Sequence, residues 1–320
     1  MPNPDSLLTV LHVFERGGSQ RTGPAEQHEK LIYLVESTDE HRLVRGLAGF
    51  GLGFMADGLL QDDSQSLTKD EIRNLNRSAR KKLLHFLEFR YGVTEGYEPE
   101  KVQLPSVDSA DDLFVSWCCT DALTQLDHDE VISKAIKLCN ECTGDTVVET
   151  EIRAQAVYIM GVLGRRTAHK HDLAAQALLD LLREESTTQN VRAHGYAAQA
   201  VARLWIGEPN AAGVEESGVL EGAADDASIT QPGEYGLENK LSEPVLRKRA
   251  ARNLILCRDQ LEKMMGESHH SWLRRKISEA LGEIGTEKAL ELLKQQVRLE
   301  MSRTRTLRNA IHMLSDRIDR

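Results

Sequence analysis

Four of the five cysteines fall in two close pairs, a spacing that could hold a metal ion. Cys118 and Cys119 are adjacent, and two residues separate Cys139 from Cys142. A structural zinc site needs four ligands that converge on the metal, at about 2.3 Å for thiolates. Adjacent residues on a helix point about 100 degrees apart, so two such pairs on antiparallel helices cannot converge. We therefore predict buried small residues, and we expect no metal or cofactor.

The histidines form no catalytic constellation either. His169 and His171, and the adjacent His269 and His270, fall in predicted turns between helices, where surface or helix-capping roles are expected. The chain also lacks a Gly-x-Ser-x-Gly motif, a His-Glu-x-x-His motif and a glycine-rich phosphate-binding loop. The sequence thus predicts a protein without catalysis of its own.

The elements that must position these residues are helices that recur in pairs. Residues 152–206 show helix, turn and helix at a fixed pitch, and second helices open with an aliphatic residue followed by arginine. The markers of the six second helices are Arg45, Ser116 in place of arginine, Arg153, Arg192, Arg274 and Arg308. The steps between these markers are 71, 37, 39, 82 and 34 residues, and insertions account for the two long steps.

Small residues recur at fixed positions behind each marker. Gly53, Gly161 and Gly282 all stand eight residues after an arginine. A glycine inside a helix costs up to about 1 kcal/mol relative to alanine, so its recurrence predicts close packing between neighbouring helices. The other glycines of GLAGFGLGF, Gly46, Gly49 and Gly51, are interpreted in the same way.

This periodicity predicts an all-α chain of about six helix-turn-helix repeats in three parts. Residues 1–206 hold a cap helix at Asp5–Glu15 and repeats one to four, 207–244 form an acidic insertion, and 245–320 hold repeats five and six. Thr68 and Glu71 have the spacing of a capping box before the helix that runs to about Arg90. A proline-containing connection follows that helix.

Composition narrows the class of protein. The 320 residues carry a net charge of −10, no apolar run reaches the roughly 18 residues of a membrane span, and the N-terminus carries acid rather than a basic signal region. Five cysteines, an odd number, do not suggest a disulfide framework. We expect a cytoplasmic protein that does not insert into membranes.

Charge is unevenly distributed along the chain. From Val245 to the end there are 17 basic against 10 acidic residues, whereas 207–244 holds nine acids and only Lys240. The basic clusters are Arg80–Lys82, Arg247–Arg252, Arg274–Lys276 and the arginines at 298, 303, 305 and 308. Nucleic-acid binding by the C-terminal repeats is therefore the first alternative function. The acidic insertion could fold against these repeats or dock a partner.

The segments VRGLAGFGLG, IRAQAVYIMG and LRRKISEALG resemble the signature of HEAT repeats, in particular the short bacterial type also found in phycobilin lyases. The resemblance covers Ala25 to Ile318 and implies an α-solenoid whose second helices line the concave side. It also implies that the repeat arginines bind acids in neighbouring repeats. HEAT-type deoxyhypusine hydroxylase binds iron through several His-Glu dyads, whereas only His28-Glu29 has that form here. A lyase or metal-dependent hydroxylase is thus the second alternative.

The prediction for function is a scaffold, adaptor or regulatory subunit that binds another protein. Its partner surface should lie on exposed residues of the second helices, which include the Trp, Tyr and Arg types that dominate interface energetics. The candidates are Gln155, Tyr158, His194, Arg203, Trp272, Arg275, Lys276, Glu279 and Asn309.

Overall fold

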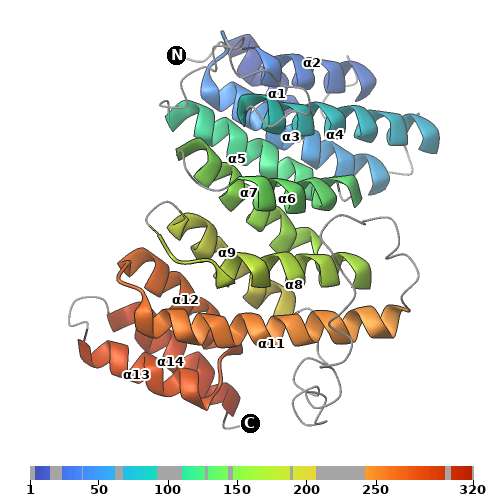
Figure 1. The fold of residues 1–320 in the computed structure, drawn as a ribbon. Helices are drawn as coiled ribbons and strands as arrows, with labels where there is room; N and C mark the ends of the chain where they lie inside the picture. The colour runs from blue at the N-terminus through green and yellow to red at the C-terminus, as the bar shows by residue number, and fades with distance from the viewer. Residues whose placement is uncertain are drawn as a thin grey trace. The chain divides into compact units, whose positions relative to one another are not determined.

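The computed structural model describes residues 4–14, 24–37, 39–61, 68–91, 110–126, 129–142, 147–187, 190–206, 242–299 and 304–318. Within these ranges every regular element is an α-helix, and the thirteen helices pack largely in sequential pairs (Figure 1). The prediction of an all-α protein is confirmed for this part of the chain. None of the helices described is long and apolar enough to cross a membrane.

The chain divides into two compact units, Met1–Lys134 and Ala135–Arg320, and the boundary falls within helix α6. The first unit holds α1 (Pro4–Phe14), α2 (Pro24–Glu36), α3 (Arg42–Gln61), α4 (Lys69–Tyr91), α5 (Ala110–Gln125) and the start of α6 (Asp129–Glu141). Helix α3 packs against α2 and extensively against α5. The cap helix predicted at Asp5–Glu15 is α1, which contacts α2 and α3.

The predicted capping box at the start of α4 is confirmed. The backbone N–H of Thr68 donates to Glu71 Oε2 at 2.7 Å, and the backbone N–H of Glu71 donates to Thr68 Oγ1 at 3.3 Å. The backbone N–H and the hydroxyl of Thr68 both donate to the Glu71 carboxylate and lower the pKa of that group. Helix α4 therefore begins at the residue that the sequence pattern indicates.

The second unit holds the rest of α6 and seven further described helices. Its helices are α7 (Val147–Leu163), α8 (Ala168–Arg183), α9 (Val191–Ile206), α11 (Glu243–Glu267), α12 (Ser271–Ile284), α13 (Glu287–Leu299) and α14 (Thr304–Ile318). Helices α7, α9, α12 and α14 contact one another in that order, and α8 packs along α11. This arrangement is repeat-like: each helix contacts mainly its neighbours in sequence and in the series.

The recurrent glycines pack where the sequence predicts close approach. A Cβ added at Gly161 would lie 2.9 Å from the Cα of Ala200, and one added at Gly282 would lie 2.9 Å from the Cα of Ala310. In the first unit, a Cβ at Gly53 would lie 2.7 Å from the Cα of Ala122. In each case the obstacle is the backbone of the next helix in the series, so a glycine is needed for the two helices to pack this closely.

Two predicted connections lie outside the described residues. They are residues 207–241 of the acidic insertion and the connection at 92–109. The chain is described again from Ser242, and α11 starts at Glu243 with Pro244 in its first turn. Proline is well placed there because the first N–H groups of a helix have no partner within the helix.

Candidate protein-binding surface

The nine residues predicted to form a partner surface all lie on α7, α9, α12 and α14 of the second unit, the helices that contact one another in series. Five are half-buried: Tyr158, Arg203, Trp272, Lys276 and Glu279. Arg275 and Asn309 are exposed. We call the side chains of Tyr158, Tyr196, Arg203, Trp272, Arg275, Lys276, Glu279 and Glu283 the second-helix face.

The prediction that Gln155 and His194 are exposed is wrong, because both are fully buried. The projection assumed one exposed stripe on every second helix. On α7, however, every residue from Glu151 to Val157 is buried, so the stripe that contains Tyr158 does not extend back to Gln155. His194 points toward α8 and takes part in the polar network described below.

Helices α7, α9 and α12 each contribute a side chain to one end of the face. The guanidinium carbon of Arg203 lies 5.1 Å from the centroid of the Tyr158 ring, within the range of a cation–π contact. Burial raises the pKa of Glu283, an effect that the positive charge of Arg203 opposes and the negative charge of Glu279 reinforces. Arg203 thus interacts with an aromatic ring from one helix and a carboxyl group from another.

At the other end of the face, Trp272 lies against the backbone of α9. A Cβ added at Gly195 would lie 2.2 Å from Cζ3 of the indole, so the ring occupies the space that a side chain would need. The ring also lies near Tyr196, with centroids 6.2 Å apart and planes tilted by 58 degrees. Trp272 is half-buried in the first turn of α12 and packs between helices.

Between these ends, α12 presents a compact set of charges. Glu279 Oε2 accepts from Lys276 Nζ at 3.0 Å, and Glu279 Oε1 lies 3.4 Å from Arg275 Nε. Both pairs join positions three or four residues apart on one helix face. They hold two long cationic side chains near the Trp272 end of the face.

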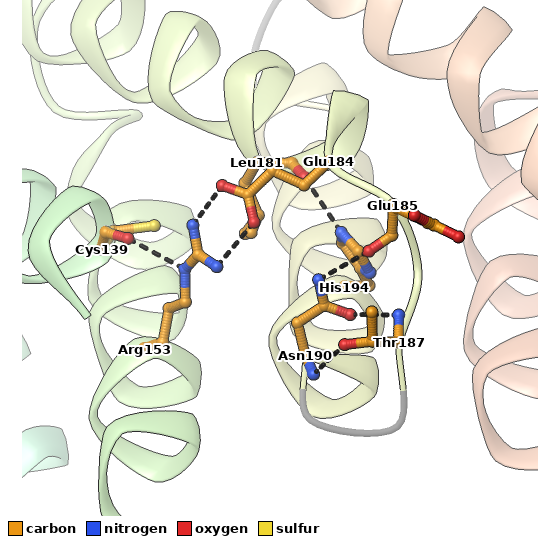
Figure 2. Close-up of polar contacts among 8 residues, drawn as sticks. All are labelled: Cys139, Arg153, Leu181, Glu184, Glu185, Thr187, Asn190 and His194. Carbon is orange, nitrogen blue, oxygen red and sulfur yellow. Dashed lines mark hydrogen bonds and ion pairs between the residues drawn. The ribbon is translucent and has the colours of Figure 1, made fainter. Parts of the chain in front are cut away.

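A polar network centred on the buried Arg153 connects α6, α7 and α8 (Figure 2). Arg153 Nε donates to the Cys139 carbonyl oxygen at 2.9 Å, and Arg153 Nη1 donates to Glu184 Oε2 at 2.7 Å. Nη2 donates to the other carboxylate oxygen of Glu184. The Arg153 side chain is almost fully buried. Through Nε it binds the C-terminal end of α6, and through the bidentate pair it binds the C-terminal end of α8.

His194 makes the equivalent contact one helix pair later. Its Nε2 donates to the carbonyl oxygen of Leu181 at 2.9 Å, near the end of α8. Burial lowers the pKa of His194, and the positive charge of Arg153 adds to this effect, while the Leu181 carbonyl and Glu184 oppose it. His194, two residues after the marker Arg192, thus makes the contact to the preceding helix that Arg153 makes on α7.

The turn between α8 and α9 is held by reciprocal hydrogen bonds. The backbone N–H of Thr187 donates to Asn190 Oδ1 at 2.8 Å, and Asn190 Nδ2 donates to the Glu185 carbonyl oxygen at 2.8 Å (Figure 2). The N–H of Asn190 lies 3.4 Å from Thr187 Oγ1. These contacts position the start of α9, and with it the stripe that carries Tyr196 and Arg203.

The HEAT resemblance implies that the marker arginines bind acids in neighbouring repeats, and the described ion pairs show this for Arg153 and Arg192. Arg153 and Arg192 bind acids of neighbouring helix pairs; Arg192 Nη1 lies 2.6 Å from Glu151 Oε1. Arg45 donates to the carbonyl oxygen of Val35, near the end of α2, at 3.2 Å, and Arg274 donates to that of Ser268, just before α12, at 2.8 Å. Arg308, the fifth, is exposed on α14.

Many cations of the predicted basic clusters are held in ion pairs. The described pairs are Arg80–Glu130, Lys82–Glu36, Arg247–Glu243, Arg249–Asp172, Arg275–Glu279 and Lys276–Glu279. Asp172 is fully buried, so Arg249 is fixed against α8 rather than directed to solvent. A cation paired with a carboxylate must exchange that partner before it can bind phosphate, which reduces the gain from counterion release.

The cysteines are packing residues, as the sequence predicts for them. Cys119, Cys139, Cys142 and Cys257 are buried and Cys118 is half-buried. Burial raises the pKa of Cys118 and of Cys139 to about 11 and that of Cys142 to about 12. Among the described residues, no group of three or more His, Cys, Asp and Glu side chains is placed to hold a metal ion.

One of the two histidine pairs does not lie in an inter-helix turn, contrary to the prediction. His169 and His171 lie in the first turn of α8, and His171 is buried. Helix α8 starts earlier than predicted because Thr167 caps it, accepting from the backbone N–H of Lys170 at 3.2 Å. His28 of the His-Glu dyad is also buried, and burial lowers its pKa.

One surface was not predicted from the sequence. In the first unit, Leu43, Phe50, Phe54 and Phe114 are 37–44 % exposed although they are large and apolar. The sequence does indicate an apolar surface here, because residues 46–56 contain no charged residue over more than three helical turns. The glycines of this run predict only packing, because they account for the close contact with α5.

Comparisons of the chain with protein-family models, with curated proteins and with solved structures found no match. The function is therefore argued from the surfaces described above.

Proposed function

We propose that this chain is a HEAT-type α-solenoid that acts by binding another protein through the second-helix face of its second unit. The HEAT resemblance of the sequence, the serial contacts of α7, α9, α12 and α14, and the glycine contacts between these helices support the proposed architecture. In such an array, the exposed stripes of successive helices combine into one extended binding surface.

The observation that carries the proposal is the pre-organised contact between Arg203 and Tyr158, with Glu283 nearby. Binding hot spots are enriched in Trp, Tyr and Arg, and all three types are present on this face. Side chains already held by neighbours lose less conformational entropy when a partner binds. The face thus combines the residue types and the rigidity that a protein interface requires.

The charges on the face favour a polypeptide over a polyanion. Glu279 and Glu283 lie among Arg203, Arg275 and Lys276, so positive and negative groups alternate over short distances. A nucleic-acid surface would instead concentrate cations along a backbone track. Mixed charge suits a partner that offers both signs and apolar anchors.

The test is affinity capture from the native cell with three baits: the wild type, a Tyr158→Ala/Arg203→Ala variant, and a Gln176→Ala/Arg183→Ala variant. Gln176 and Arg183 are exposed on α8, so the third bait is a matched control. A protein recovered by the wild type and the control but lost with the face variant supports the proposal. Recovery of nucleic acid alone, or a partner insensitive to the face variant, contradicts it.

A further inference from the structure

Exposed apolar side chains concentrate in the first unit. Six of the nine large apolar residues that are exposed among the described residues belong to α1, α3 and α5. Single exposed apolar residues are normal on a soluble surface, but a cluster indicates an interaction site. An interaction site requires that the exposed apolar side chains be contiguous.

On α3 they form one stripe. Leu43, Leu47, Phe50 and Phe54 follow the spacing of four, three and four residues that places side chains along one side of a helix. Leu47 is half-buried and the other three are exposed. The stripe runs beside Gly46, Gly49 and Gly53, which pack on α5, so it borders the α3–α5 contact.

Helix α5 continues the surface. A Cβ added at Gly46 would lie 2.4 Å from Cε1 of Phe114, so this exposed ring lies on α3 between the positions of Leu43 and Phe50. Trp117, one turn later on α5, is half-buried. The apolar face therefore spans two helices and consists of Leu43, Leu47, Phe50, Phe54, Phe114 and Trp117.

Helix stacking does not require apolar residues at these positions. Counted from the marker arginine, the corresponding positions of α12 in the second unit are Trp272, Lys276, Glu279 and Glu283. Helix α12 packs on α14 through Gly282, a glycine contact of the same kind as those of α3. The apolar stripe of α3 thus serves something other than the packing of the array.

We propose that the apolar face of α3 and α5 binds the same face of a second copy of this chain about a two-fold axis. The face is self-complementary because α3 has no charged residue between Gly46 and Ala56, so two copies meet there without like-charge repulsion. Phe50 is in the middle of the stripe and lies nearest the axis.

The available area is consistent with a small dimer. Fully burying an aromatic side chain removes on the order of 150–250 Å² from water, so rings about 40 % exposed each offer roughly 60–100 Å². Leu43 and the three phenylalanines then supply roughly 250–400 Å² per copy, and a pair of copies supplies about 500–800 Å². The half-buried residues and a polar rim must supply the remainder of the roughly 1,000 Å² that a specific interface needs.

The test measures the mass of the full-length protein by light scattering at protein concentrations from about 1 to about 100 µM. This range covers the dissociation constants expected of small interfaces. We expect a shift from 35.8 kDa toward twice that mass. Phe50→Glu should remain at 35.8 kDa throughout. Tyr33→Glu and Met313→Glu change exposed apolar residues outside the face and should dimerise as the wild type does.

A mixing experiment separates loss of the interface from loss of the fold. Phe50→Glu and Phe50→Lys should each be monomeric alone, and an equimolar mixture should restore the dimer mass because opposite charges then meet near the axis. A wild type that is monomeric at every concentration would overturn the proposal. A dimer that survives Phe50→Glu, or a mixture that stays monomeric, would do so too. None of these outcomes bears on the second-helix face, which belongs to the other unit.

Discussion

Gly161 on α7 lies so close to α9 that a methyl group added to it would come within 2.9 Å of the Cα of Ala200 and 2.8 Å of its Cβ. Because the obstacle is backbone, the clash cannot be relieved by rotating a side chain. The two helices would have to separate along their length. The contact therefore links one sequence position to the spacing of the whole helix series.

Gly161→Ala should destabilise the protein by about 1 kcal/mol net. Overpacking costs about 1–3 kcal/mol, and the higher helix propensity of alanine offsets about 1 kcal/mol of it. Gly266→Ala on α11 is the matched control because nothing lies within 4 Å of the added Cβ, and it should be neutral or slightly stabilising. Urea unfolding measures both; equal stability of the two variants would argue against the close helix contact.

Arg153→Ala should lower the free energy of unfolding by about 2–4 kcal/mol, because it removes a buried cation that binds Glu184 and the Cys139 carbonyl. Arg183→Ala removes a pair with Asp180 in which both side chains are 56 % exposed. That change should cost less than about 0.5 kcal/mol. The comparison is made by chemical denaturation, and similar losses for the two variants would contradict the assigned role of Arg153.

Stability should fall as the pH drops below about 7, in part because of His194. Burial lowers the pKa of His194 below 6.5, so the unfolded chain binds a proton that the folded chain excludes. His194 thus destabilises the fold as the pH falls through 6.5 and contributes no such penalty above it. A single titrating group can change the free energy of unfolding by at most about 1.4 kcal/mol per pH unit.

His194→Gln should flatten this dependence between pH 5.5 and 7.5, measured by urea unfolding at several pH values. Glutamine can still donate to the Leu181 carbonyl oxygen, so the variant retains a donor there. Gln295→Ala changes an exposed side chain on α13 that does not titrate, and it should keep the wild-type slope. If His194→Gln leaves the slope unchanged, this residue does not control it.

The thiols should react slowly with iodoacetamide at pH 8 in the folded protein. Burial raises the pKa of Cys118, Cys139 and Cys142 to about 11 or 12, so little thiolate is present. Cys118 should be modified first, because it is half-buried whereas the other four are buried. Mass spectrometry of intact protein and peptides follows the order, with urea-unfolded protein as the fully reactive reference. Rapid native labelling of Cys139 would contradict its packing.

Features that depend on local chemistry could be predicted from the sequence alone. The all-α class follows from apolar residues at helical spacing, and the Thr68–Glu71 capping box forms because its partners are only three residues apart. The spacing of Gly161 and Gly282 predicted close helix contacts without a structure, since repetition at one position places the same constraint on each helix pair.

The tertiary structure decided which polar residues reach the surface and which ion pairs form. Gln155 and His194 occupy positions that a single helix could expose, and neighbouring helices bury them. Arg249 pairs with Asp172, 77 residues away, so its availability to a ligand could not be inferred from its cluster. Phe50 is exposed although its sequence context suggests a core. Burial depends on how many neighbours surround a helix, and that number is a property of the assembled chain rather than of any one segment.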